Sequence, residues 1–204
     1  MDEIGIFPLG LVLLPTEQVP LHIFEPRYRE LIDECLEQDA PFGLLYADDD
    51  GIRQVGTLAV VTEVIERFED GRLNVVVEGR ERFRLIELTE GREFHTGLVE
   101  PVDDQHDPNE PDDIQRALEL FTRLVELTGS DLPSPAAETP QLSFALAGRF
   151  DFSADLKQEL LDETSERIRL RRLCELLATA AETVERQREI AARAQTNGKV
   201  QPPA

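Results

Sequence analysis

Residues 4–28 read IGIFPLGLVLLPTEQVPLHIFEPRY, and this stretch is the most apolar part of an otherwise acidic chain. Four prolines divide it, namely Pro8, Pro15, Pro20 and Pro26. Proline lacks an amide donor and is excluded from helix interiors and central strands. The apolar runs between these prolines are therefore predicted to be short extended segments that enter a β-core. Pro26 suits the first position of a helix, which is predicted to follow directly.

One helix and a series of short strands are predicted after this entry segment. The helix covers about 26–38, because its apolar residues recur at helical spacing: Tyr28, Leu31, Ile32, Cys35 and Leu36. Strands are expected at 42–47, 55–68, 73–77, 80–89 and 93–100, and Glu69-Asp70-Gly71 is expected to form a hairpin connection. Short strands with a single early helix predict a small curved sheet or barrel rather than alternating βαβ units.

The composition shifts at residues 101–113, where acidic residues stand between prolines. This pattern predicts a solvated linker between two domains. Beyond it the hydrophobic period is helical, and helices are predicted over about 114–129 and 139–148, after Ser153, and from Thr164 onward. The predicted fold class is α+β, with a β-domain at 1–108, a bundle of about four helices at 109–190 and a disordered tail at 191–204.

The composition also excludes several classes of partner. A net charge of −21 opposes binding to phosphate backbones, so nucleic acid is not expected as a partner. No apolar run approaches the roughly 20 residues of a membrane span, and the N-terminus lacks the basic character of a secretory signal. We therefore expect no membrane partner and a cytoplasmic location. Cys35 and Cys174 are expected to be buried free thiols on helix faces.

Motifs typical of catalysis, metal binding or nucleotide binding do not occur in the sequence. The three histidines stand outside any Gly-x-Ser-x-Gly context, and the chain contains no Cys-x-x-Cys, His-Glu-x-x-His or phosphate-binding loop. We therefore predict no catalytic residue, no metal ligand and no cofactor. One enzymatic alternative remains, a small hydrolase or ligand-binding enzyme that uses His22 with Glu25; it requires both side chains in one pocket.

The only cluster of basic residues is Arg80, Arg82 and Arg84, which would project from one face of a strand. Such a strip could bind an anion. In a chain this acidic, pairing with carboxylates on the neighbouring strand 61–69 is the favoured interpretation.

An ordered series of motifs runs along most of the chain. It begins with Ile6-Phe7-Pro8-Leu9-Gly10, continues through Val12-Leu13-Leu14-Pro15 and Val19 to Tyr28, and includes Gly71-Arg72-Leu73-Asn74-Val75, Gly79 to Phe83 and Leu156 to Leu161. This series resembles the N-terminal domain of Lon protease and spans about 4–177. The resemblance implies a PUA-like β-domain, a helical bundle and a non-catalytic role in engaging unfolded protein. Since the sequence holds no ATPase or peptidase motif and ends at Ala204, we expect a stand-alone domain.

The function expected on these grounds is recognition of exposed apolar or unfolded polypeptide segments in protein quality control, with a separate protease as a further partner. The entry segment carries more apolar side chains than one strand needs, so its loop residues are either core or binding surface. The expected peptide-binding residues are Phe7, Leu9, Leu11, Leu21, His22, Arg27 and Tyr28. A structural role through self-association is a further alternative, and the sequence leaves the oligomeric state open.

Overall fold

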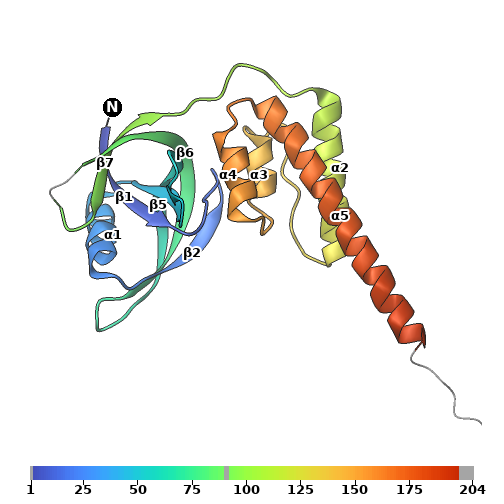
Figure 1. The fold of residues 1–204 in the computed structure, drawn as a ribbon, viewed down its shortest axis with the longest axis horizontal. Helices are drawn as coiled ribbons and strands as arrows, with labels where there is room; N and C mark the ends of the chain where they lie inside the picture. The colour runs from blue at the N-terminus through green and yellow to red at the C-terminus, as the bar shows by residue number, and fades with distance from the viewer. Residues whose placement is uncertain (1, 90–91, 198–204) are drawn as a thin grey trace, which may run out of the picture.

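The computed structural model describes residues 2–89 and 92–197, in which a β-rich region is followed by helices (Figure 1). The β-rich region contains β1 (Asp2–Leu9), β2 (Gln18–Ile23), α1 (Pro26–Gln38), β3 (Phe42–Asp48), β4 (Gly51–Ile52), β5 (Val55–Arg67), β6 (Leu73–Thr89) and β7 (His95–Pro101). The helical region contains α2 (Pro111–Thr128), α3 (Leu142–Ala147), α4 (Ala154–Asp162) and α5 (Glu166–Asn197). The predicted α+β fold class is confirmed.

The strands close into a barrel in the order β1, β7, β6, β5, β3, and β1 then pairs with β3. The closing pair is parallel, with Ile6 opposite Gly43, whereas the other pairs around the ring are antiparallel. β2 lies outside this ring and pairs with the first half of β6. Closing the ring leaves the five barrel strands paired on both sides.

β6 is one strand where the sequence predicted two. Gly79 in this strand contacts the loop before β2, and a Cβ atom there would come within 2.2 Å of the Leu14 carbonyl oxygen. Thr16 N donates to the Gly79 carbonyl at 2.8 Å, and Gly79 N donates to the Glu17 carbonyl at 2.9 Å. Glycine at this position therefore marks a close backbone crossing inside a strand.

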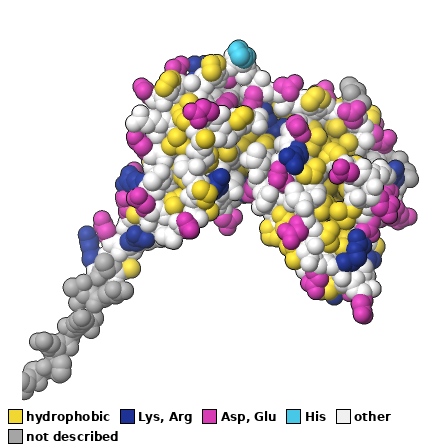
Figure 2. All heavy atoms as spheres, turned by 180° about the vertical axis from the view of Figure 1, so that it is seen from behind, with side chains coloured by type: hydrophobic (Ala, Val, Ile, Leu, Met, Phe, Trp, Pro, Cys, Tyr) yellow, Lys and Arg dark blue, Asp and Glu magenta, His cyan; other side chains and the backbone are white. Residues whose placement is uncertain are grey.

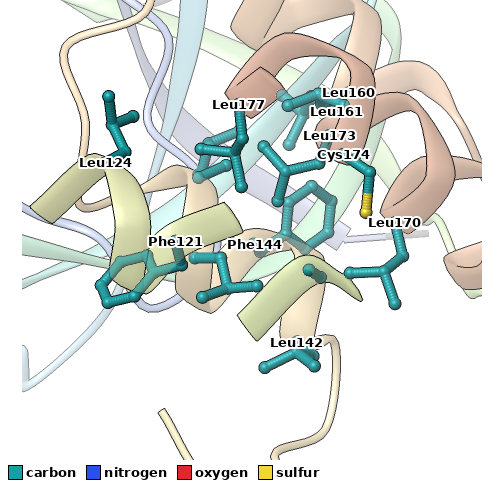
Figure 3. Close-up of a cluster of buried hydrophobic side chains, with 14 of the residues drawn as sticks. Phe121, Leu124, Leu142, Phe144, Leu160, Leu161, Leu170, Leu173, Cys174 and Leu177 are labelled. Carbon is teal, nitrogen blue, oxygen red and sulfur yellow. The ribbon is translucent and has the colours of Figure 1, made fainter. Parts of the chain in front are cut away.

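Two large apolar clusters form the core. The first lies in the β-rich region, where α1 contributes Tyr28, Leu31, Ile32 and Cys35, and a smaller cluster of strand residues there contains Ile6, Leu45, Phe83 and Val99. The second lies among the helices (Figure 3), and it also includes Val12, Leu14 and Val55 from the barrel region. Because this second cluster is built from both regions, the helices and the barrel share buried apolar contacts.

The linker and the tail both differ in part from the prediction. The side chains of residues 101–110 are exposed or partly exposed, but the linker is also attached to the helices, since Gln105 N donates to the Thr164 carbonyl at 2.8 Å and Asp107 accepts from Ser165. Residues 191–197 are helical and belong to α5, which runs past the end of α2 and away from the barrel (Figure 1). This segment is rich in alanine, which favours helix. Residues 198–204 of the predicted tail lie outside the described residues.

Candidate functional site

The structure places the seven predicted peptide-binding residues in two groups. Phe7, Leu21 and Tyr28 are buried in the apolar cluster that α1 shares with the strands, where Phe7 and Tyr28 stack with ring centroids 4.0 Å apart. Leu9 and Leu11 are partly buried against the same cluster, and His22 and Arg27 are exposed. The buried residues Phe7, Leu21 and Tyr28 are not accessible to a partner in this conformation. The other four, Leu9, Leu11, His22 and Arg27, are at least partly accessible.

His22 and Glu25 do not form the pair that a hydrolase would need. The Nδ1 atom of His22 lies 2.6 Å from Asn74 Oδ1, which can only accept, so Nδ1 carries the proton. Glu25 instead accepts from Arg27 Nε at 2.9 Å. Neither residue lines any of the five cavities described for residues 2–89 and 92–197. The enzymatic alternative is therefore wrong in its geometry.

The three arginines of β6 pair with carboxylates, but not with those on the neighbouring strand. Arg80 lies 3.0 Å from Glu78, and Arg84 lies 3.9 Å from Glu100 of β7. Arg82 is buried and donates to Asp104 in the linker, and also to the Leu161 and Glu163 carbonyls at 2.7 and 2.8 Å. The partners predicted on strand 61–69 are wrong, because in the β5–β6 register Arg82 and Arg84 stand opposite Thr57 and Val55, whereas residues 61–67 stand opposite residues 73–77.

Arg82 belongs to a buried polar cluster that joins the two regions, which we call the junction cluster (Arg82, Asp104, Glu166 and Arg169). The side chain of Arg169 is fully buried and donates to both oxygens of Asp104, at 3.0 and 2.8 Å, and to Glu166 Oε2 at 2.5 Å. Its guanidinium also lies 3.9 Å from the Phe144 ring centroid. One arginine thus connects the linker, α3 and α5, while Arg82 adds β6.

The protonation of Asp104 reflects its partners. Burial alone would raise the pKa of this carboxyl, but hydrogen bonds from Arg169 and Gln141, together with the charges of Arg169 and Arg82, outweigh burial. The pKa of Asp104 is therefore lower than its ordinary value, and the group is a carboxylate at neutral pH.

A second buried ion pair, Glu17 with Lys157, crosses the same junction. Lys157 Nζ donates to Glu17 Oε1 at 2.5 Å, while Glu17 Oε2 accepts from Leu14 N at 2.9 Å. Both side chains are at least nine-tenths buried. This pair attaches the loop before β2 to α4.

Next to this pair the two regions enclose a cleft of about 710 Å3, which we call the junction cleft. Thr16 and Gln18 line it from the barrel side, and Thr16 has a φ of 69°, in the left-handed region. The helical side contributes the apolar side chains of Leu132, Pro135, Phe144 and Ala145, together with Thr139, Gly148 and Arg149. Volumes of this size are typical of ligand sites in proteins.

Sequence reasoning missed the junction cluster. The available signal was Arg169 itself, which stands four residues before Leu173 on the predicted apolar stripe of α5. An arginine on a buried helix face needs a carboxylate partner, but nothing in the sequence indicated that the partner would be Asp104.

The described part of the chain offers no arrangement of three or more His, Cys, Asp or Glu side chains around a metal position. Within residues 2–89 and 92–197, no helix has the length and apolar character needed to cross a membrane.

A closed β-barrel attached to a helical bundle, with an apolar cleft at their junction, defines the class of this molecule as a two-part α+β domain. A family profile described as the ATP-dependent protease La (LON) substrate-binding domain matches residues 3–179. The chain belongs to this family.

Solved structures agree with this assignment. The chain is similar to a Lon N-terminal domain protein from Xanthomonas campestris, with 26% identity and a TM-score of 0.65 over 87% of this chain and 98% of that one. The N-terminal domain of a Mycobacterium avium complex Lon protease shares the fold, with a TM-score of 0.68 at 18% identity over 87% of this chain and 98% of that one.

Curated relatives are much longer than this chain. The Lon protease of Paraburkholderia phytofirmans is 28% identical over 207 residues, which cover 93% of this chain and 25% of the relative. The Lon protease of Parabacteroides distasonis is also 28% identical, over 71% of this chain and 18% of the relative. The chain spans about a quarter or less of the length of these relatives.

Proposed function

We propose that this chain binds polypeptide segments that expose apolar side chains, and that it does so without a chemical step. Its membership of a substrate-binding domain family over residues 3–179 carries the proposal. The junction cleft supports it, because apolar side chains line one wall and polar groups from the loop before β2 line the other. Such a mixture suits an extended peptide, which brings both apolar side chains and backbone hydrogen-bonding groups.

The ion pairs at the junction favour this use of the cleft. Because the junction cluster and the Glu17–Lys157 pair fix the two walls relative to each other, the cleft exists before a peptide arrives. A preformed site avoids the ordering cost that binding would otherwise incur. Leu9, Leu11, His22 and Arg27, which are exposed or partly exposed in the β-rich region, are proposed as additional contacts.

The biological setting is part of the proposal. We infer a role in protein quality control in the cytoplasm, in which bound segments are passed to a separate protease. The support is the similarity to N-terminal regions of Lon proteases, of which this chain matches about a quarter or less.

Binding can be tested by fluorescence anisotropy with labelled peptides that carry either apolar or polar side chains on the same backbone. Wild type should bind the apolar peptides. Leu132→Asp in the cleft should weaken binding about ten-fold or more, since burying one leucine stabilises by roughly 1.5–3 kcal/mol. The control is Ile65→Asp, an exposed position on β5. Equal binding of apolar and polar peptides by wild type would refute the proposed function.

A further inference from the structure

β2 is a strand with one free edge. It lies outside the barrel ring, and among the strands of residues 2–89 and 92–197 it pairs with β6 alone. A free edge presents backbone N–H and C=O groups without partners, and such groups form a template for pairing with another chain. This edge extends from Gln18 to Ile23, a length of about 20 Å.

The backbone bonds at the start of β2 show which groups face the free edge. The Glu17 carbonyl accepts from Gly79 N of β6 at 2.9 Å. The N–H of Gln18 belongs to the same planar peptide unit as that carbonyl, so it points away from β6. Successive residues of an antiparallel strand alternate in this respect. The residues whose backbone groups face β6 are thus Val19, Leu21 and Ile23, and those whose groups face the free edge are Gln18, Pro20 and His22.

The position of Pro20 agrees with this assignment. Proline has no N–H to donate, and Pro20 stands where the missing group would face away from β6, as is usual for proline in an edge strand. Apart from the ladder with β6, no hydrogen bond within residues 2–89 and 92–197 reaches the backbone of Gln18 or His22. The edge therefore offers N–H groups at Gln18 and His22 and C=O groups at all three edge-facing residues.

The free edge begins in the junction cleft. Gln18, the first residue of β2, lines the cleft, and Lys157 Nζ of α4 donates to Glu17, the residue before it, at 2.5 Å. Figure 1 shows β2 running from the helices toward α1. An extended peptide that lies in the cleft would therefore continue along β2. The cleft provides apolar side chains for such a peptide, and the edge provides partners for its backbone.

Exposed rings flank the far end of the edge. The Phe24 side chain is 60% exposed, and its ring centroid lies 5.9 Å from that of His22. The Phe68 ring lies on another side of His22, with centroids 6.1 Å apart. A strand added beside β2 would place one of its side chains next to His22. An apolar or aromatic side chain at that position would bury part of the exposed Phe24 ring.

The charge of the chain argues against a second copy as the added strand. The net charge is −21, and Figure 2 shows acidic side chains among the hydrophobic atoms of both regions. Two copies joined at β2 would bring like charges together, which opposes self-association. A segment of a different polypeptide does not carry this penalty.

We propose that a bound polypeptide segment pairs with the free edge of β2 as an added strand, with its backbone hydrogen-bonded to Gln18, Pro20 and His22. This inference rests on the proposed function and specifies how the bound segment is held. The mode is β-strand addition, in which main-chain hydrogen bonds supply affinity. Such binding selects an extended backbone, so segments of many different sequences fit the same edge.

Amide hydrogen exchange followed by NMR tests the assignment of the edge. In free wild type, the amides of Gln18 and His22 should exchange rapidly, whereas those of Val19 and Leu21 should be protected by β6. The probe is a peptide of about eight residues in which valine alternates with serine, which is long enough to cover β2. When this peptide saturates the protein, exchange at Gln18 and His22 should slow by about ten-fold or more.

Methylation of the peptide backbone provides the decisive comparison. One labelled form of the peptide carries N-methyl groups on its valines, and a matched form carries them on its serines. Only alternate residues of an added strand direct their N–H groups toward β2. In anisotropy titrations, one methylated form should therefore bind about ten-fold or more weakly than the unmodified peptide, and the other should change by less than about three-fold.

A proline substitution tests the same bonds from the side of the protein. His22→Pro removes an N–H group from the free edge without removing a bond to β6, whereas the matched variant His22→Ala keeps that group. His22→Pro should bind the unmodified peptide about ten-fold more weakly than His22→Ala. If His22→Pro does not fold, the two methylated peptides with wild type still decide the question.

The outcomes separate the two proposals. If wild type binds the unmodified peptide but both methylated forms bind to the same extent, the added-strand proposal fails and the proposed function stands. If wild type binds neither this peptide nor any apolar peptide in the cleft assay, both fail. If sedimentation shows that wild type is a dimer and that His22→Pro makes it monomeric, a second copy covers the edge and the added-strand proposal is overturned.

Discussion

Replacing Arg169 by methionine tests whether the junction cluster holds the barrel and the helices together. Methionine keeps a flexible stem of similar length but removes five hydrogen-bonded contacts, to Ser143, Asp104, Glu163 and Glu166. The side chains of Asp104 and Glu166 are only 18% and 13% exposed, so they would lose their arginine partner without regaining full hydration.

The expected loss of stability follows from the partners that remain. Removing one member of a buried ion pair costs about 3–5 kcal/mol. Asp104 would keep its contacts with Arg82 and Gln141, so we expect Arg169→Met to be near the lower limit, at about 3 kcal/mol. For a chain of this length, that free energy lowers Tm by about 6–12 °C.

Urea titration and calorimetry would measure both quantities. The matched control is Arg172→Met on the same helix, whose arginine is 38% exposed and pairs with Glu159 and Glu175. Its loss should cost at most about 1 kcal/mol. If Arg169→Met and Arg172→Met unfold at the same urea concentration, the junction cluster does not stabilise the fold and the argument is refuted.

Three further results are expected. The pKa of Asp104 in the folded chain lies below the ordinary value of 3.8, so its carboxylate stabilises the fold above that value and loses this contribution as the pH falls through the folded pKa. The free energy of unfolding should therefore fall less steeply on the acid side for Asp104→Asn than for wild type. Parallel pH profiles of stability would contradict this. Glu17→Gln should lower the free energy of unfolding by about 3 kcal/mol, because it leaves the Lys157 ammonium without its charge partner. In urea titrations, adding Lys157→Met should recover at least half of that loss. Additive losses of stability would show that the pair is not coupled. Burial raises the pKa of the Cys35 thiol to about 11. A thiol reagent at pH 8 should therefore label Cys35 slowly in the folded chain and rapidly in urea. Fast labelling of Cys35 in the folded chain would show that the thiol is accessible.

The elements that local chemistry determines could be predicted from the sequence. Pro26 and the spacing of Tyr28 to Leu36 predicted α1 with its observed ends, at Pro26 and Gln38. Gly71, with a φ of 86°, forms the predicted hairpin. The helix predicted after Ser153 is α4, and Ser153 caps it, since its hydroxyl accepts from Leu156 N. In each case a few neighbouring residues contain the whole signal.

Contacts between distant residues could not be predicted in this way. The junction cluster joins Arg82 to Asp104 and Asp104 to Arg169, and no local pattern specifies such pairs. The acidic residues of the linker predicted a solvated segment but gave no sign that Asp104 and Asp107 bind the distant Arg169 and Ser165. For the same reason, the sequence could not separate the buried Phe7 from the accessible Leu9, since an apolar side chain indicates burial without indicating which contacts bury it.

The closure of the barrel affects how the protein is made. β1 is synthesised before both strands with which it pairs, β3 and β7, and its register with β7 joins Asp2 to Val99. At about 5–20 residues per second, a ribosome needs roughly 5–20 s to make the intervening chain. Until β7 has been made, β1 lacks at least one of its two neighbours, so its apolar residues depend on other protection, such as a chaperone, during translation.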